Sequence, residues 1–305
     1  MTDEIAVGPL EEQDVAEADA VFRLAFGTAI GLPEPSRFAE GTEMVGTRWR
    51  ADPSRAFKAE SGGELVGSAF VTRWGSSAVF GPLTVRPDHW NRGVGRLLWT
   101  ACAGLIEGWG VTHTALFTRP EPKNVHLYLS LGFWPGSLTA LTAKELGEGS
   151  PGPAADTPAD VAACRAVAGA VYPGLDLECE IRAVDEQRLG GTVVIRDDEG
   201  AAGFAVCHVG EGSEAGPGAC YVKFGAARPG TDAPARLAEL LDAVEAYAAA
   251  SAATRLVAGV NTARHGAYRL LLDRGHRTLA FGVAMHMASE PAYDRPDAWV
   301  LDDRR

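Results

Sequence analysis

The sequence predicts an α/β fold of the α+β kind, with two similar halves that each form a mixed, mainly antiparallel sheet flanked by helices. Two observations predict it. The elements expected from hydrophobic periodicity follow the order β-β-β-α-β-α-β in the first half of the 305 residues, and the same order returns in the second half. Between the halves, residues 147–160 are rich in Gly, Pro, Ala and Asp, as linkers are. A meander followed by β-α-β units gives such a sheet.

The first half begins with an amphipathic helix over Glu11–Phe26. A hairpin follows, and its strands Arg55–Glu60 and Leu65–Trp74 are joined by the turn SGGE. A third strand covers Ser77–Val85, and a helix begins after a pair of glycines. That helix carries apolar residues at helical spacing, namely Leu98, Cys102, Leu105, Ile106 and Trp109. The half ends with a strand, a helix and a strand at His113–Thr118, Lys123–Gly132 and Leu138–Ala143.

The second half repeats these elements, which favours an internal duplication. Its expected elements are Gly191–Asp197, Ala202–Val209, Ala219–Ala227, Ala233–Ala249, Arg255–Val260, Ala263–Gly275 and Leu279–Met287. The boundaries that follow are a first domain over residues 1–146, a linker over 147–160, a second domain over 161–290 and a tail over 291–305. The tail is acidic and broken by prolines, with aromatic anchors at Tyr293 and Trp299. We expect it to lie across a surface of this chain or of a partner subunit.

Composition excludes several classes of protein. The formal net charge of −12 argues against a nucleic-acid partner, which would need a basic face. An acidic surface mildly favours cationic partners such as amines, although it also simply keeps a protein soluble. Five cysteines without C-x-x-C spacing are typical of reduced thiols, and the histidines form no metal-ligand pattern. With no signal peptide and no long apolar run, we expect a cytoplasmic protein without a membrane segment or a bound metal.

The stretch PDHWNRGVGRLLW, from Pro87 to Trp99, joins the third strand to the following helix. The first amides of a helix have no acceptor inside it, and the helix dipole adds partial positive charge there, so a phosphate fits. Glycines let the backbone approach an anion closely. A pyrophosphate would meet the amides of Gly93, Val94, Gly95 and Arg96, with the side chains of Arg92 and Arg96 nearby. Alone, this G-x-G also fits a plain turn, because Leu98 stands where a dinucleotide motif has its third glycine.

A second motif decides between these readings. PKNVHLYLSLGFWP lies one helix and one strand later, with Tyr128 four residues before Gly132-Phe133. Together the two motifs resemble the GNAT acetyltransferase superfamily, which has V-x-P-x-x-[QR]-x-x-G-x-[GA] after a strand and later a helix ending in Tyr-x-x-x-Gly-Phe. The resemblance covers residues 1–146 with both motifs, and about 157–290 by element order alone.

The resemblance implies a site for acyl-CoA in a V-shaped gap where two parallel strands splay apart. It implies that the pantetheine arm pairs with the backbone of Leu83, Thr84 and Val85. The pyrophosphate would lie on the loop and helix start formed by Asn91, Arg92, Gly93, Val94, Gly95 and Arg96. Asn124 stands where the family often contacts CoA, and Tyr128 matches the tyrosine that protonates the leaving thiolate.

One position departs from the family pattern, because Trp90 stands where the family has Gln or Arg. Its ring would either cover the phosphates or, more simply, pack on the helix. No general base is identified. His89 and His126 are candidates, but surface histidines are the simpler interpretation; solvated surface charge is the simpler interpretation of Asp88 and Glu121.

The second half lacks the phosphate-binding loop. Its matching stretch, AARPGTDAPARLAELL, keeps Pro229 and Gly230 but has no G-x-G, and Asp232 would repel a pyrophosphate. Tyr268 stands seven residues before Gly275, not four. We interpret this half as a degenerate copy that shapes the first site or supports a homodimer.

The sequence therefore predicts an N-acetyltransferase that moves an acetyl group from acetyl-CoA to a primary amine of a small molecule or peptide. The alternative is a non-catalytic acyl-CoA-binding or sensor protein with the same fold. Such a protein would keep the loop but would not need Tyr128 to reach the thioester.

Overall fold

The structure is a computed structural model that describes residues 4–147, 160–287 and 291–305. Most of the expected linker lies outside these residues. None of the described helices is long and apolar enough to cross a membrane.

In the first half, the expected elements are present within a few residues of their predicted ends. The structure has β1 (Ile5–Pro9), α1 (Val15–Ala29), α2 (Val45–Ala51), β2 (Ala56–Ser61), β3 (Glu64–Trp74), β4 (Ser77–Val85), α3 (Val94–Trp109), β5 (His113–Thr118), α4 (Pro122–Ser130) and β6 (Trp134–Glu145). The short elements β1 and α2 were not predicted, because five or seven residues carry too little periodicity.

The second half begins with two helices that the sequence pattern did not predict, α5 (Val161–Val171) and α6 (Glu178–Glu186). The duplicated elements follow as β7 (Gly190–Asp197), β8 (Gly200–Gly210), β9 (Gly216–Ala227), α7 (Ala233–Ala250), β10 (Arg255–Asn261), α8 (His265–Asp273) and β11 (Arg277–His286). A two-residue strand, β12 (Val300–Leu301), comes last.

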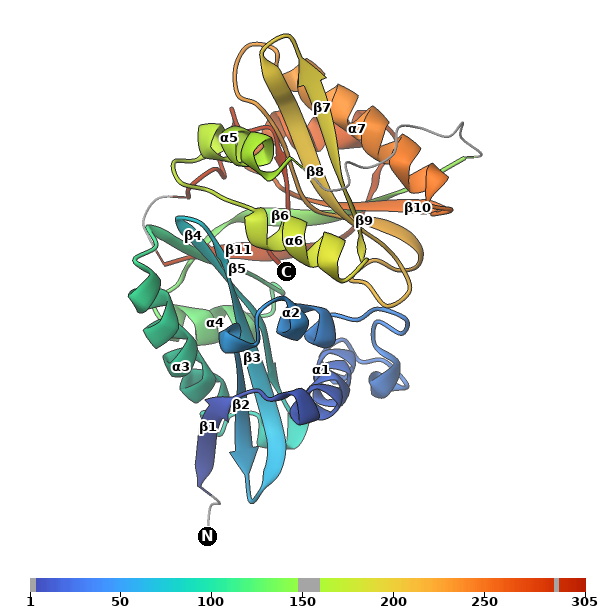
Figure 1. Cartoon of the computed structure of the whole chain (residues 1–305). Coiled ribbons are helices and arrows are strands. Elements are labelled where there is room, and N and C mark those ends of the chain that lie inside the picture. Colours follow the sequence, from blue (N-terminus) through green and yellow to red (C-terminus); the bar gives the residue numbers. More distant parts are fainter. Residues whose placement is uncertain (1–3, 148–159, 288–290) are drawn as a thin grey trace.

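The described strands form one 12-stranded sheet in the order β1-β2-β3-β4-β5-β11-β6-β10-β9-β8-β7, with β12 paired to β9. The last strand of each half lies inside the other half. β11 pairs with β5 of the first half, and β6 pairs with β10 of the second half. β6 and β11 also pair with each other and cross the middle of the molecule (Figure 1). Each half therefore completes its sheet with a strand from the other.

Helices cover both faces of this sheet. The apolar face predicted for α3 is buried at Leu98, Cys102 and Ile106, where it packs on β3 and β4. Helices α1 and α2 cover the opposite face of the first half. Helices α5 and α6 pack in a cluster that includes Trp74 and Val79 of the first half, so apolar burial holds the halves together.

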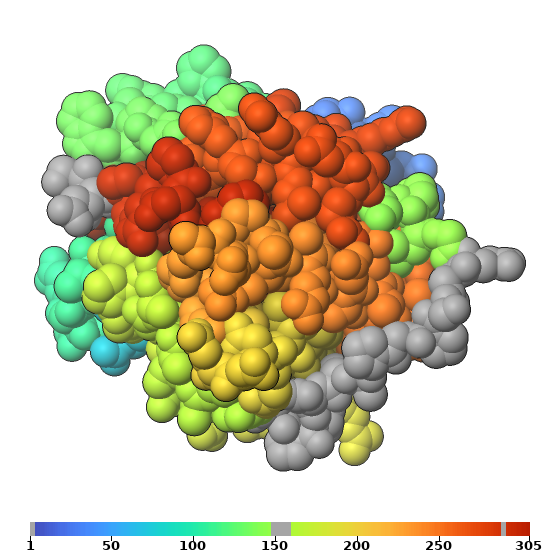
Figure 2. Space-filling model, turned by 90° about the horizontal axis from the view of Figure 1, so that it is seen from above, coloured from blue at the N-terminus to red at the C-terminus, as the bar shows by residue number. Residues whose placement is uncertain are grey.

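The tail differs from its expectation as a surface segment. Tyr293 is 1% exposed, and Asp302 and Asp303 are 1% and 2% exposed. Seen from above, the dark red end of the chain is packed among the orange and yellow-green parts of the second half (Figure 2). Acidic composition was misleading here because the buried carboxylates are paired: Arg264 bonds both Asp294 and Asp302.

Candidate functional site

The two parallel strands β4 and β5 pair only at their beginnings. Ser77, Ala78 and Val79 pair with His113, Thr114 and Ala115, and the register ends there. From Phe80 onward β4 pairs with β3 alone, while β5 continues beside β11. The structure thus has the splayed gap that the fold prediction required.

The backbone of β4 presents alternate residues to this gap. The amide of Arg86 donates to the carbonyl of Val66 across the β3–β4 pair. In an antiparallel ladder, bonded pairs alternate with unbonded ones, so Thr84 bonds toward β3 while Leu83 and Val85 direct their backbone groups into the gap. The Thr84 side chain is buried, and its hydroxyl has no hydrogen-bond partner among the described residues.

The glycine junction stands at the end of this gap. Gly93 is the residue before α3 and has a φ of 83°, a left-handed conformation that favours glycine. The amides of Arg96 and Leu97 both bond the carbonyl of Gly93. The amides of Val94 and Gly95 come earlier in the helix, where no intrahelical acceptor exists.

Gly95 leaves room that a side chain would take. A Cβ there would lie 3.5 Å from Leu83 Cδ2 and 3.8 Å from Leu127 Cδ2, which are ordinary contacts. The protein itself therefore does not require glycine at this position. This position lies where α3, β4 and α4 meet.

Trp90 ties the junction to the strand. Its indole N–H donates to the carbonyl of Val85 at 2.7 Å, and the Lys123 ammonium lies 4.5 Å from its ring centroid. Of the two roles expected for Trp90, these contacts favour packing. It holds the loop where the Gln or Arg of the family would stand.

The other predicted binding residues surround the same junction. Asn91 has a φ of 62°, and the Arg92 side chain is exposed. The Arg96 guanidinium donates to Ser130 of α4. Asn124 lies in the first turn of α4, with its Nδ2 3.4 Å from Glu121 Oε2. The structure thus brings all of the predicted residues to one end of the gap or along β4.

Tyr128 lies beside the point where the strands separate. Its ring packs edge-on against Phe80, with centroids 6.4 Å apart, and Phe80 is the first β4 residue beyond the β4–β5 pairs. The hydroxyl has no hydrogen-bond partner among the described residues. Burial raises the pKa of Tyr128, so the group stays protonated at neutral pH. A protonated hydroxyl is what a proton donor needs, although a raised pKa also makes it a weaker acid.

The loop carboxylates are poor candidates for a general base. The Arg86 hydrogen bond, helped by His89, lowers the pKa of Asp88 to about 2. The Arg119 hydrogen bond lowers the pKa of Glu121 in the same way. His89, expected on the surface, is 8% exposed because it is packed behind Arg86 and Asp88.

Arg48, which the sequence analysis did not single out, contacts β4 from the face of the sheet opposite α3. Arg48 of α2 donates to the carbonyl of Gly81 at 2.7 Å and pairs with Glu214 of the second half. It lines a cavity of about 60 Å³ between α2, β3, α6 and β8. The Glu180 carboxylate also lines this cavity and accepts from Trp74, and it interacts electrostatically with Arg48. Since α2 is too short to predict, no sequence signal indicated this cavity.

The second half has no comparable anion site at its helix start. Asp232 is the N-cap residue of α7 and makes no side-chain capping hydrogen bond, so its carboxylate stands at the helix start where a phosphate would bind. The Tyr268 hydroxyl is 2.9 Å from Thr278 Oγ1 and so is engaged in the sheet. Among the described residues, no group of three or more His, Cys, Asp or Glu side chains could hold a metal ion.

A mixed sheet with a splayed parallel pair, closed at one end by a glycine-led helix, defines the class of folds that bind acyl-CoA along a strand. Residues 25–133 match the family model "Acetyltransferase (GNAT) family". No curated protein matches the sequence.

Solved structures resemble the whole chain. A protein from Pyrococcus horikoshii assigned as an acetyltransferase has a TM-score of 0.69 at 13% identity, covering 97% of this chain and 93% of its own. A GCN5-related N-acetyltransferase from Sphaerobacter thermophilus has a TM-score of 0.58 at 18% identity, covering 92% and 95%. A tandem GNAT protein from the clavulanic acid biosynthesis pathway has a TM-score of 0.55 at 14% identity, covering 95% and 100%. Residues 25–133 thus match the GNAT acetyltransferase family, and the likeness of the whole chain to these structures shows a tandem GNAT fold.

Proposed function

We propose that the chain is an N-acetyltransferase that uses acetyl-CoA and carries its active site in the first half. The observation that supports this most is the joining of two features at one place, the β4–β5 gap and the glycine-led start of α3. The proposed domain boundaries place both features within residues 1–146.

The residues present fit acetyl-CoA. Gly95 leaves a space that a Cβ would fill, and the amides of Val94 and Gly95 are available to a phosphate. The backbone groups of Leu83 and the amide of Val85 face the gap, where a pantetheine arm would pair with them, while the Val85 carbonyl already accepts from Trp90. When bound, acetyl-CoA would supply an activated acetyl thioester. This thioester and the acceptor amine are the two reacting groups.

The chain's own residues then have three tasks. The Leu83 amide, directed into the gap, stabilises negative charge on the thioester oxygen as the amine attacks. As the carbon–sulfur bond breaks, Tyr128 donates a proton to the departing sulfur, and the proton that the amine nitrogen loses passes to solvent water, which restores Tyr128. On the other face of the sheet, Arg48 holds the Gly81 carbonyl.

The acceptor in this proposal is a primary amine on a small molecule or peptide. The cavity beside Arg48 supports an amine because the carboxylates of Glu180 and Glu214 line it. Its volume of about 60 Å³ holds only the end of a molecule, a few water-sized volumes of roughly 10–15 Å³ each.

The second candidate is an acyl-CoA-binding protein without catalysis, and the raised pKa of Tyr128 favours it. Calorimetry with acetyl-CoA, followed by transfer assays with polyamines, aminoglycosides, amino-acid amines and peptides, separates the two. We expect one acetyl-CoA per chain and acetylation of at least one amine class. Binding without any transfer would support the second candidate, and absence of binding would refute both.

A further inference from the structure

The second half has its own splayed gap. β9 and β10 run parallel and pair from Ala219 with Arg255 to Val222 with Ala258, and the register stops there. In the first half, β4 and β5 pair over the matching positions and then separate. The duplication has therefore kept the gap even though it has lost the phosphate-binding loop.

This gap is filled by the chain's own tail. Beyond Val222, the free side of β9 pairs with β12, so that Val300 lies opposite Ala226 and Leu301 lies opposite Gly225. The amide of Ala227 donates to the Trp299 carbonyl at 3.0 Å. On the β10 side, a Cβ at Gly259 would lie 2.3 Å from Asp303 Cβ, so the tail fills the space between the strands.

The tail contacts β9 at positions that correspond to the β4 positions proposed to contact acetyl-CoA. The sequences VRP and ARP align Val85 with Ala227, and two residues earlier they align Leu83 with Gly225. The tail also runs from the helix-start end of the gap, at Trp299, toward the centre of the molecule, at Arg305. A pantetheine arm in the first gap would run in the same direction, from its phosphates to its thioester.

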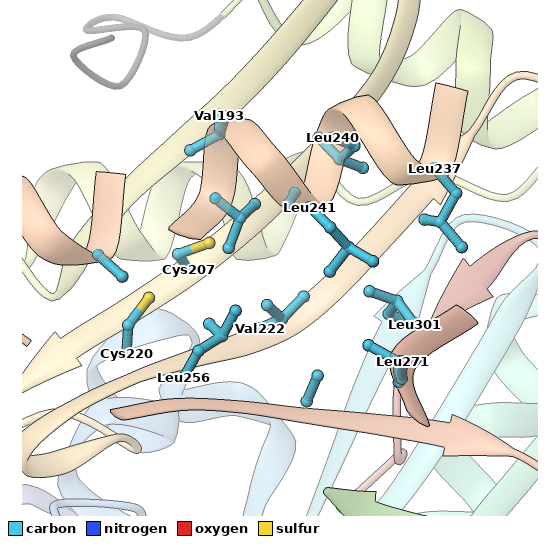
Figure 3. Close-up of a cluster of buried hydrophobic side chains, with 14 of the residues drawn as sticks. Val193, Cys207, Cys220, Val222, Leu237, Leu240, Leu241, Leu256, Leu271 and Leu301 are labelled. Atoms are coloured by element: carbon cyan, nitrogen blue, oxygen red, sulfur yellow. The ribbon is translucent and has the colours of Figure 1, made fainter. Parts of the chain in front are cut away.

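Side-chain contacts also bind the tail to the second half. Leu301 is 1% exposed and lies among Leu271, Leu241 and Val222 in the core of the second half (Figure 3). Arg264 donates to the carbonyl of Val300 at 2.8 Å and pairs with Asp302. The Trp299 ring lies against Gly266 in the first turn of α8, the helix that corresponds to α4.

We propose that residues 299–305 are an internal ligand of the second half, a strand that occupies the gap where the first half takes acyl-CoA and that excludes acyl-CoA from it. In this proposal the gap of the second half is a site for an extended peptide. Without the tail, the edge of β9 would have unpaired backbone groups that such a peptide can bond. The correspondence of the two gaps rests on the proposed function; the occupancy of the second gap by the tail does not.

Displacement of the tail by a single methyl group tests the occupancy. In Gly266→Ala, the new Cβ would lie 2.5 Å from the Trp299 ring and must push it away. Gly169→Ala is the matched control, because Gly169 is also helical and has nothing within 4 Å. We expect the Ala227 amide to exchange with deuterium at least tenfold faster in Gly266→Ala and at the wild-type rate in Gly169→Ala. Equal exchange in all three proteins would overturn the proposal.

A second test adds the tail back as a separate molecule. A chain that ends at Ala298 is incubated with a synthetic peptide, WVLDDRR, or with the same peptide carrying Leu301→Asp. We expect the native peptide to bind and raise the melting temperature, and the variant to fail at tenfold higher concentration. Equal effects of the two peptides would overturn the proposal, and if the shortened chain does not fold, the exchange experiment decides alone.

Neither readout uses acetyl-CoA. If the peptide restores the shortened chain but acetyl-CoA does not bind the wild type, the proposed function fails and the internal ligand stands. If calorimetry gives two acetyl-CoA molecules per chain, the internal ligand fails and the proposed function of the first half stands.

Discussion

Replacing Gly95 by Asp should move folding stability and acetyl-CoA binding in opposite directions. Gly95 is the second residue of α3, and the first turn of this helix holds no acidic residue. An aspartate near a helix N-terminus stabilises the helix by roughly 0.3–1 kcal/mol, and its higher helix propensity than that of glycine adds about 0.3 kcal/mol. The added Cβ meets only ordinary contacts of 3.5 Å or more, so the protein alone has no reason to resist it.

Binding should suffer for two reasons. The side chain takes the space beside Leu83 and Leu127, which removes one or two phosphate–amide bonds of about 1.5–3 kcal/mol each. Its charge also repels a phosphate; at about 5 Å this costs about 1–3 kcal/mol for an effective dielectric constant between about 80 and 20. Since each 1.4 kcal/mol or so is a factor of ten, we expect acetyl-CoA affinity to fall by about 100-fold or more.

The assay pairs thermal unfolding with calorimetry on wild type, Gly95→Asp and Gly95→Asn. Asparagine has nearly the same shape as aspartate but no charge. Gly95→Asn should therefore show only the part of the affinity loss that comes from steric exclusion of the phosphate. The difference in acetyl-CoA affinity between Gly95→Asp and Gly95→Asn should become smaller as salt is added, because salt screens the repulsion between aspartate and phosphate. Gly93 is less suitable, because its φ of 83° would strain any replacement. If Gly95→Asp binds acetyl-CoA as tightly as wild type, the junction is only a turn and the proposed site is wrong.

Three further outcomes follow from the same structure. Tyr128→Phe keeps the ring against Phe80 and removes the hydroxyl, so turnover of an accepted amine should fall about 100-fold while acetyl-CoA affinity stays within twofold; unchanged turnover would assign the proton donor elsewhere. Residues 1–149 expressed alone should be poorly soluble or inactive, because β5 and β6 would lose the strands β11 and β10 beside them, and full activity from that fragment would contradict this. Stability to urea should fall between pH 7 and pH 5, because burial lowers the pKa of four histidines that are neutral when folded and have a pKa of about 6.5 when unfolded; a flat profile would contradict it. Each histidine contributes about 2 kcal/mol to that loss as an upper bound, with folded pKa values of about 4 for His208, His276 and His286 and about 3 for His113.

The sequence was informative where the signal is local. The strand Ser77–Val85 was predicted to the residue, because its apolar run ends at a proline and a glycine pair. Gly93 and Gly95 could be placed at a helix start for the same reason. The splayed gap was expected only from the family resemblance, and the structure shows it as the end of the β4–β5 register after Val79.

The sequence was uninformative where partners are distant along the chain. Nothing in Leu138–Ala143 tells that this strand pairs with β10 of the other half, because an alternating strand accepts any neighbour of matching pattern. Arg48 lies 166 residues from its partner Glu214, and both look like surface charges until the fold buries them together. The tail misled for the same reason, since its aspartates are buried only because Arg264 and Arg304 meet them.

These distant contacts converge on one guanidinium. Arg48 donates through one nitrogen to the Gly81 carbonyl, at the inner end of the β4 gap, and through another to the backbone carbonyl of Arg305 at 2.5 Å. Arg305 is the inner end of the tail that fills the second gap. In the alignment that matches Val85 with Ala227, Gly81 corresponds to Lys223, which also bonds Glu214, the partner of Arg48. The inner ends of the two gaps therefore meet at a single buried ion network, and the tail fills the second of these gaps. If the first half binds acetyl-CoA as proposed, this network would make the second half part of the wall of that site, which would give a copy without a phosphate loop a reason to retain its fold.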